Sequence, residues 1–365
     1  MKYHKFRIIS LTLFFIGFIS FPIINDTCYF VKDSANYENR ALAKKPVFDI
    51  NYLDPYPELF EKYYNDHFSM RFRLIKYFNY FNMVVFKQSP YPWFFIAGYN
   101  NWHYLSGREL YCYQGIARFN AEHLKFYKQT FEAQKKYLEE HGCKFYVMIT
   151  PSKAIVYPEN MPHHYYRYYK ESIGEQLTKY LRDSSKINVI SVYETFEKIK
   201  TKNQLYYRYD THWNNKGAFY ASTIACSSIG KDFPSVMPLS DLDFIIKEKI
   251  RVGGDLVNLL SNPEDYEETD YEFISKRTNK PFRFGRILDN EKRFSNQPKK
   301  PDILLVSDSF SNLFFPFIAE SFNKSLNIFD ESNYNLQTDL VEKEKPAVYL
   351  LMIHEPLLLN MIEKK

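Results

Sequence analysis

The N-terminus carries a long apolar run. No charged residue occurs between Ile8 and Ile24, whereas three basic residues precede the run and Asp26 follows it. At about 1.5 Å per residue in a helix, the run falls at the short end of what spans the hydrocarbon core of a bilayer. Basic residues before an apolar segment favour a cytoplasmic N-terminus. We therefore predict a membrane helix, a signal anchor, in residues 1–25.

A cleaved signal peptide is the alternative, because the run is also close to the length of a signal sequence. The residues that follow are Asn25, Asp26 and Thr27, which form no small-x-small cleavage site and do not suit a lipoprotein signal before Cys28. We favour the uncleaved anchor. Both alternatives place the bulk of the chain outside the cytoplasm, and the anchor predicts a single-pass protein of the cell inner membrane with a periplasmic domain.

Residues 26–90 are predicted to hold a stalk and an aromatic helix. The stalk, 26–54, is polar and has no sustained periodicity. From 57 to 87, apolar and aromatic residues recur at helical spacing. This spacing predicts a helix whose apolar stripe packs on the core.

Residues 91–365 are predicted to form an α/β domain. Residues 93–105 are predicted to form a hairpin with its turn at 98–101. Helices then alternate with short apolar strands, which predicts a mostly parallel sheet with helices on both faces. The region 232–300 is the least regular and is predicted to hold loops near a cleft. The predicted strands are 144–149, 188–191, 302–306, 326–329 and 347–353, and the predicted helices are 117–140, 171–182 and one after Asn214 and Asn215.

Composition narrows the classes of function. The 32 Tyr and 33 Phe suit sugar rings or membrane interfaces, although codon bias is the simpler explanation. The net charge of +5 is spread in short runs without a basic stripe, so we predict no nucleic-acid binding. The four cysteines lack metal-ligand spacing, and we predict neither a metal nor a cofactor. Three disulfide pairings remain possible, and so do buried free thiols.

One candidate for chemistry is Ser309. The buried strand that begins at Asp302 runs into Ser307, Asp308 and Ser309, and an apolar helix follows from about Leu313. Ligands of parallel sheets bind beyond the carboxyl ends of the strands, and the free N–H groups of a helix N-terminus stabilise negative charge there. The segment therefore suits an acyl-transfer nucleophile. The alternative is helix capping, for which Asp and Ser are the commonest residues.

A second candidate is the pair Asp210 and His212, two residues apart and just ahead of a predicted helix. An extended or turn segment at a strand end can direct both side chains to one side. The carboxylate then orients the imidazole, which takes a proton from a hydroxyl. The alternative is a loop histidine beside a capping aspartate. His354 ends an apolar strand and is a lesser candidate. The other histidines, such as His67, His103, His163 and His164, are predicted to be surface or packing residues.

Several spaced motifs resemble the alginate O-acetyltransferase family. The closest is Asp210-Thr211-His212-Trp213-Asn214, which is similar to the family's Asp-x-His-Trp-Asn, and Asp308-Ser309-Phe310 resembles its Gly-Asp-Ser serine block. One departure is Ser307, where the family has glycine, and we expect it to alter the oxyanion geometry because glycine permits positive φ. The other similar blocks are Glu38-Asn39-Arg40 with Lys45-Pro46, Asn65-Asp66-His67-Phe68 with Arg71, Gly98 to Leu105, Pro151-Ser152-Lys153 with Tyr157-Pro158, and Gly254-Asp255-Leu256.

The resemblance implies an SGNH-hydrolase-like catalytic domain whose serine follows the Asp and His, as in a circular permutation. It implies Ser309 as nucleophile, His212 as base and Asp210 as its orienter. Lys153 and Tyr157 come just past the carboxyl end of a predicted strand, and we predict that they line the cleft and, with Trp213, bind the substrate. Loop packing is the alternative for Lys153 and Tyr157. The implied activity is O-acetylation of an extracytoplasmic polysaccharide, with the acyl group supplied by a membrane-bound O-acyltransferase partner. Two alternatives remain open: a carbohydrate acetyl esterase with the same triad, and a non-catalytic glycan-binding subunit of a polysaccharide export complex.

Overall fold

The computed structural model divides the chain into two compact units. The first unit comprises Met1–Pro90 and Val257–Asp265, and the second comprises Tyr91–Leu256 and Tyr266–Lys365. The structure describes residues 2–31, 41–260, 263–277, 282–287, 290–294, 297–330 and 334–363. The predicted motif block Glu38-Asn39-Arg40 lies outside the described residues.

In its described residues, the first unit contains three α-helices: α1 (Lys2–Cys28), α2 (Tyr56–His67) and α3 (Arg71–Tyr80). The N-terminal apolar helix is therefore confirmed, and its length and composition are sufficient to cross a membrane. Near the end of α2, the Asp66 carboxylate accepts the Ala43 N–H at 2.8 Å and so holds the stalk on this helix.

The single helix predicted over 57–87 is wrong. The chain breaks after α2, where Met70 adopts a left-handed φ of 67°, and α3 continues into a π-helical turn, Phe81–Val85. The aromatic stripe is not a core stripe either, because side chains such as Tyr77 and Phe78 are exposed. Periodicity identifies an apolar face but not what covers it.

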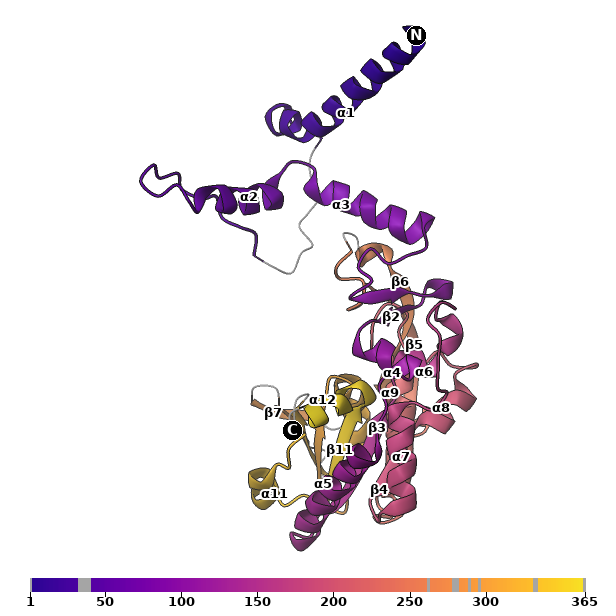
Figure 1. Cartoon of the computed structure of the whole chain (residues 1–365). Helices are drawn as coiled ribbons and strands as arrows, with labels where there is room; N and C mark the ends of the chain where they lie inside the picture. Colours follow the sequence, from indigo (N-terminus) through magenta and orange to yellow (C-terminus); the bar gives the residue numbers. More distant parts are fainter. Residues whose placement is uncertain are drawn as a thin grey trace. The chain divides into compact units, whose positions relative to one another are not determined.

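The second unit contains a seven-stranded sheet (Figure 1). Five strands are parallel, in the order β4-β3-β11-β9-β10, and β8 and β7 extend the β10 edge with antiparallel pairing. The sheet confirms the predicted mostly parallel α/β fold. The strands are β3 (Lys144–Thr150), β4 (Asn188–Ser191), β7 (Phe282–Ile287), β8 (Asn290–Phe294), β9 (Ile303–Ser307), β10 (Lys324–Phe329) and β11 (Val348–His354).

Continuous apolar runs explain the central strands. Every residue of β9 and of β11 is buried, as expected for strands covered on both faces. β11 is the last strand in sequence, yet it pairs with both β3 and β9: Val348 lies opposite Lys144 on one side and Ile303 on the other. The core of the unit therefore depends on the end of the chain.

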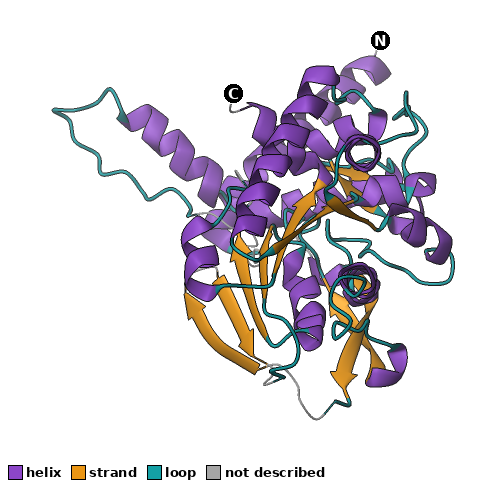
Figure 2. Cartoon of the chain, turned by 90° about the horizontal axis from the view of Figure 1, so that it is seen from below, coloured by secondary structure: helices purple, strands orange, loops and turns teal. Residues whose placement is uncertain are grey.

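Helices lie on both sides of the sheet (Figure 2). Side-chain caps begin three of them, with Asn120 before α5, Ser172 before α7 and Asn214 before α9. The helix α5 ends before Gly142, whose φ of +70° lies in the left-handed region that favours glycine. The helices of this unit are α4 (Arg108–Gln114), α5 (Ala121–Glu140), α6 (Lys153–Val156), α7 (Ile173–Ser184), α8 (Tyr193–Ile199), α9 (Asn215–Ile229), α10 (Ser311–Ile318), α11 (Thr338–Glu344) and α12 (Leu358–Glu363).

Two antiparallel hairpins complete the second unit. β1 (Phe95–Ala97) pairs with β2 (His103–Leu105), which confirms the hairpin predicted over 93–105. β5 (Phe244–Val252) pairs with β6 (Glu267–Ser275) inside the region that was predicted to form loops, so that prediction is wrong. Most side chains of β5 are exposed, and a strand without a buried run gives little signal in the sequence.

Candidate active site

Ser309 lies in the turn between β9 and α10. The buried carboxylate of Asp308 shapes this turn, because its Oδ1 accepts the Phe310 N–H at 3.0 Å. Its Oδ2 accepts the His354 N–H at 2.6 Å and the Tyr334 hydroxyl at 3.1 Å. Burial raises the pKa of Asp308. The turn is thus tied to the neighbouring strand β11, and Ser309 remains partly exposed.

Asp210 and His212 lie in the loop between α8 and α9. A single β-bridge between Tyr206 and Trp213 closes the loop, and no strand of the main sheet ends there. The expected position at a strand end is therefore wrong. A turn stabilised by side chains brings the pair to the site instead.

The structure brings Ser309, His212 and Asp210 into one hydrogen-bonded chain. The imidazole Nδ1 lies 2.7 Å from Asp210 Oδ1, and Nε2 lies 2.9 Å from Ser309 Oγ. An ionised carboxylate only accepts hydrogen bonds, so Nδ1 carries the proton and donates it. Nε2 is then left as the acceptor for the Ser309 hydroxyl, which is the arrangement that a general base requires.

Charge in the site favours an ionised carboxylate and a basic imidazole. Burial disfavours the charged forms of both groups, but their hydrogen bond and opposite charges outweigh it. The pKa of Asp210 is therefore well below its usual range, with a contribution from Arg251. The pKa of His212 is raised above its usual value of 6.5, with contributions from the carboxylates of Asp255 and Asp308.

Arg251 fixes the second oxygen of Asp210, a role that the sequence did not indicate. Its Nη2 donates to Asp210 Oδ2 at 2.6 Å, while its guanidinium lies 4.0 Å from the centre of the Tyr207 ring. Arg251 comes from β5, in the region that was predicted to be irregular. With Oδ1 bound to the imidazole and Oδ2 to the guanidinium, the carboxylate has one orientation.

The Gly254-Asp255-Leu256 block packs against the loop that carries His212. A Cβ on Gly254 would lie 2.2 Å from the Tyr209 carbonyl oxygen, so glycine allows the two backbones to approach. The Asp255 carboxylate accepts the Thr211 N–H at 2.7 Å and the Thr211 hydroxyl at 2.6 Å. The motif match was the only signal in the sequence for this contact.

Lys153 supports the same loop from inside the unit. Its ammonium group is fully buried and donates to the carbonyl oxygens of Tyr207, Arg208 and Asp210, at 3.0, 3.1 and 2.7 Å. Burial lowers the pKa of Lys153 to about 8. The three hydrogen bonds satisfy all the donors of the ammonium group.

Tyr157 and Trp213 are also buried. The Tyr157 hydroxyl accepts the Leu205 N–H at 2.8 Å, and the Trp213 indole donates to the Phe310 carbonyl at 3.0 Å. Lys153, Tyr157 and Trp213 were predicted to bind the substrate, with loop packing as the alternative for Lys153 and Tyr157. All three side chains are buried, and a role in substrate binding stays a prediction. Trp213 connects the histidine loop directly to the serine turn.

Ser307 fits its position without special backbone geometry. It does not have a positive φ, so nothing in this turn requires glycine. Its hydroxyl donates to Asn327 Oδ1 at 2.7 Å, and the Asn327 amide donates to the Ser311 hydroxyl at 3.0 Å. The buried serine is therefore satisfied by β10, the next strand of the sheet.

The Ser309 amide is the candidate donor for an oxyanion. The two following amides are engaged, since Phe310 N–H donates to the Asp308 carboxylate and Ser311 N–H to the Asp308 carbonyl. The Ser309 N–H donates to none of the residues that the structure describes. It also adjoins the N-terminus of α10, where backbone dipoles favour negative charge.

The other histidines take no part in the chain of hydrogen bonds. His354 stacks on the Phe310 ring at 4.2 Å, and its Nε2 lies 3.1 Å from the Glu109 carboxylate. His103 is buried beside the ring of Phe95, and burial lowers its pKa to about 4. His103 is therefore a packing residue, as predicted.

Two further features could be taken for functional sites. Asp210, His212 and Asp255 offer metal-ligand atoms within 4.8 Å of one another, but these atoms already bind Arg251, Ser309 and Thr211.

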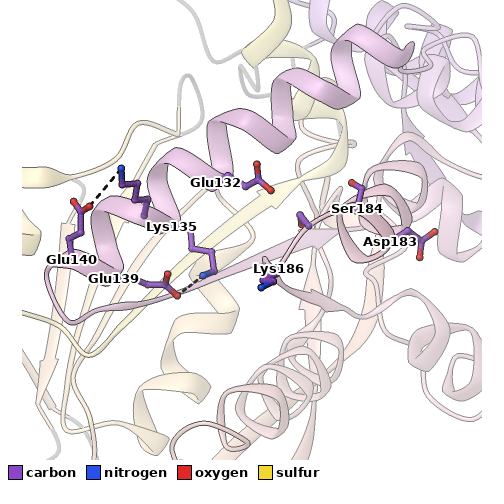
Figure 3. A pocket seen from close by; sticks show the side chains of 9 residues that line it. Glu132, Lys135, Glu139, Glu140, Asp183, Ser184 and Lys186 are labelled. Carbon is purple, nitrogen blue, oxygen red and sulfur yellow. Dashed lines mark hydrogen bonds and ion pairs between the residues drawn. The ribbon is translucent and has the colours of Figure 1, made fainter.

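The second feature is a hollow of about 790 Å³ beside α5 and the end of α7 (Figure 3). It adjoins the amino ends of β3 and β4, the edge of the sheet opposite to the Ser309 turn, and we assign it no function. Its lining residues are Glu132, Lys135, Lys136, Glu139, Glu140, Asp183, Ser184, Ser185 and Lys186.

Comparison with solved structures supports the same fold. The chain is similar to Bacillus cereus PatB1, with 15% identity over 71% of this chain and 95% of that chain and a TM-score of 0.55. PatB1 with a sulfonyl adduct gives 14% identity, the same coverage and a TM-score of 0.54. The O-acetyltransferase domain of Pseudomonas putida AlgJ gives 17% identity over 73% of this chain and 92% of that domain, with a TM-score of 0.51. No curated protein sequence matches the chain.

The fold and the arrangement of Ser309, His212 and Asp210 define an SGNH-hydrolase-like α/β protein. The family described as the SGNH hydrolase-like domain of acetyltransferase AlgX matches residues 96–342, which is more than half of the chain. The chain belongs to this acetyltransferase family.

Proposed function

We propose that the protein is an O-acetyltransferase that modifies an extracytoplasmic polysaccharide through an acyl-enzyme on Ser309. The observation that carries the proposal is the hydrogen-bonded chain from Ser309 Oγ through His212 to Asp210. Family membership supports acetyl transfer as the type of reaction. The partly exposed serine at the carboxyl edge of the sheet supports access by a large substrate.

In the first half-reaction, His212 Nε2 takes the proton of the Ser309 hydroxyl as Oγ attacks the carbonyl carbon of an acetyl ester. The negative charge of the tetrahedral intermediate develops beside the Ser309 N–H and the start of α10. The ester bond of the donor then breaks, and the imidazolium returns its proton to the departing oxygen. The product is an acetyl ester of Ser309 and a free donor hydroxyl.

In the second half-reaction, a sugar hydroxyl attacks the acetyl-Ser309 carbonyl while His212 Nε2 takes its proton. Collapse of this intermediate breaks the bond to Ser309 Oγ, which recovers the proton from the imidazolium. The sugar leaves as an acetyl ester, and the enzyme is restored. Asp210, held by Arg251, stabilises the imidazolium in both halves. Transfer exceeds hydrolysis only where the site holds the sugar in place of water.

The location and partners of the protein form part of the proposal. The helix α1 is proposed to anchor the chain in the inner membrane, with the catalytic unit in the periplasm. A membrane-bound O-acyltransferase is the proposed source of the acetyl group, since acyl donors are made in the cytoplasm and the site lies on the other side. Lys153, Tyr157 and Trp213 are proposed to hold the site rather than to touch the sugar.

The test offers the purified full chain a soluble acetyl ester, with and without chito-, cello- and mannuronate oligosaccharides. Mass spectrometry of the protein and the sugars follows the acetyl group. We expect acetyl on Ser309 and then on a sugar, and neither in Ser309→Ala. Acetate release without sugar acetylation would favour the esterase, whereas unlabelled Ser309 with intact ester would favour a non-catalytic glycan-binding subunit.

A further inference from the structure

Glu109 and His354 form a buried pair that the proposed reaction does not use. Glu109 lies on α4, and His354 is the last residue of β11. Both side chains are buried, and His354 Nε2 lies 3.1 Å from Glu109 Oε1. The other ring nitrogen, Nδ1, lies 3.5 Å from Thr150 Oγ1. These contacts from two opposite sides of the imidazole fix the plane of the His354 ring.

Packing alone does not account for this pair. The second carboxylate oxygen of Glu109, Oε2, is buried and has no hydrogen-bond partner among the residues that the structure describes. A buried carboxylate that is only partly satisfied lowers stability, and an apolar pair of similar volume is often at least as stable. Buried polar atoms of this kind call for an explanation in what they hold in place.

The His354 ring supports the ring of Phe310, the residue after the nucleophile. The two rings are stacked, with their centroids 4.2 Å apart and their planes at 22°. The Phe310 ring also lies 5.0 Å from the His212 imidazole and 5.0 Å from the Trp213 indole. Phe310 is buried, and a close-packed interior transmits a displacement of one ring to the next. Loss of the fixed His354 ring would therefore disturb the contact between Phe310 and His212.

The main chain of His354 has a separate role. Its N–H donates to Asp308 Oδ2 at 2.6 Å, whatever the side chain at position 354 is. The Phe310 main chain is likewise held by its own bonds to Asp308 and Trp213. Substitution of the His354 side chain therefore tests the ring and leaves these backbone hydrogen bonds in place.

We propose that Glu109 and His354 are a positioning pair for the catalytic imidazole. Glu109 orients the His354 ring, that ring holds Phe310, and Phe310 holds His212 at the distance from which it reaches Ser309. The proposal rests on the proposed catalytic roles of Ser309 and His212. Reaction rates depend steeply on the placement of reacting groups, so loss of the pair should slow the reaction without weakening the binding of a small reagent.

The test measures how fast Ser309 reacts with phenylmethanesulfonyl fluoride. In this reaction Oγ displaces fluoride from sulfur while His212 takes the hydroxyl proton. The purified full chain is labelled in detergent over a range of reagent concentrations, and intact mass gives the maximal rate and the half-saturating concentration. Each variant is measured at a temperature at which circular dichroism shows it to be folded.

The variants separate the ring from the carboxylate. Glu109→Leu releases the His354 ring and should lower the maximal rate at least about fivefold, with the half-saturating concentration unchanged. Glu109→Gln keeps an acceptor for the imidazole and should stay within about twofold of the unmodified chain. In the Glu109→Leu background, His354→Phe supplies a ring that stacks on Phe310 and should restore the rate to within about twofold, whereas His354→Ala should stay slow.

The matched control is Asp232→Leu. This change removes a carboxylate that accepts hydrogen bonds from Lys144 and Tyr146 at the amino end of β3, far along the strand from the serine turn. It should lower the melting temperature and leave the labelling rate unchanged.

Three results would overturn the proposal. They are a rate in Glu109→Leu equal to that of the unmodified chain, equal rates for His354→Phe and His354→Ala in the Glu109→Leu background, and an equal slowing in Asp232→Leu. If the unmodified chain is labelled no faster at Ser309 than Ser309→Ala is labelled overall, the proposed roles of Ser309 and His212 fail as well. That outcome is seen before any variant of the pair is measured, which distinguishes it from the others.

Discussion

In the second unit, aromatic side chains such as Trp213 and Phe310 are buried behind the site, where their rings contact one another at 5.0 Å. In the first unit, Tyr77, Phe78 and Phe81 stand exposed on a helix. One residue class therefore has two uses in the same chain. The difference lies in the surroundings of each ring. The buried rings pack against one another and the Trp213 indole donates to a backbone carbonyl, whereas the exposed rings lie in a segment with basic but no acidic residues. The aromatic content of a segment therefore does not tell whether its rings are buried or exposed.

The largest expected effect is on acetyl transfer, which should depend on Ser309 in the second unit and not on the exposed rings of the first. We expect Ser309→Ala to lower kcat for acetyl transfer by about 10³-fold or more, because the nucleophile is lost while binding groups remain. Phe78→Ala changes an exposed ring of the first unit and should keep full turnover of a soluble ester. Ester turnover, measured on both variants, tests the separation, and a loss of activity in Phe78→Ala would contradict it.

A second prediction concerns the stability of the second unit. Lys153→Met removes a donor from three carbonyl oxygens. The Arg208 carbonyl keeps the His103 N–H at 2.9 Å, whereas those of Tyr207 and Asp210 lose the donor that Lys153 gives them, and each unsatisfied group costs about 1–3 kcal/mol. We expect the free energy of unfolding to fall by about 3 kcal/mol, read as a lower melting temperature by tryptophan fluorescence. Lys136→Met makes the same chemical change at an exposed side chain and should have little effect. Equal melting temperatures for the two variants would show that Lys153 does not support the loop.

A third prediction tests the role of Arg251 in holding the Asp210 carboxylate. In Arg251→Met, Asp210 Oδ2 loses its short hydrogen bond and keeps the longer one from the Asp255 N–H at 3.3 Å. The carboxylate then orients the imidazole less firmly, and kcat should fall by about tenfold. Arg251→Lys should recover part of the loss, because an ammonium group binds one oxygen but not in the planar geometry of a guanidinium. The control is Arg108→Met, at an exposed ion pair. An unchanged kcat in Arg251→Met would contradict the positioning role.

The smallest expected effect is a shift in pH dependence. His212 acts as a base only when neutral, so activity should rise with pH through its pKa, which lies above 6.5. Asp255→Asn removes a carboxylate 3.7 Å from Nδ1 and should lower that pKa, which moves the acidic limb to lower pH by less than about one unit. Profiles of kcat/KM against pH measure the shift. Asp183→Asn, in the distant hollow, should leave the limb in place, and an equal shift in both variants would refute the assignment.

The sequence predicted the parallel sheet well because its central strands are continuous apolar runs bounded by turns. It also placed Asp210, His212 and Ser309 together, since each lies in a motif whose spacing carries chemistry. Arg251 was not predictable, because it reaches the site from a mostly exposed strand with no periodic signal. The sequence left Lys153 open between lining the cleft and packing in the loop. A lysine after a strand is usually exposed, and only the three-dimensional path of residues 207–210 supplies its acceptors.

The helical segments of the first unit show a second limit of prediction from the sequence. Their spacing indicated an apolar face correctly but not the break between α2 and α3, where Phe68 is extended after one helix and Met70 is left-handed before the next. Periodicity also cannot tell a face covered by protein from one covered by lipid, because both need the same residues.

The position of β11 has a consequence for biosynthesis. This strand is the last of the described strands to be made, yet it fills the centre of the sheet between β3 and β9, and its His354 amide holds the Asp308 carboxylate. Until the residues of β11 have been synthesised, β3 and β9 lack their partner on that side and the serine turn lacks one of its supports. A chain whose synthesis stops before residue 348 therefore keeps two open strand edges at the centre of its sheet, and such edges are prone to pair with other chains.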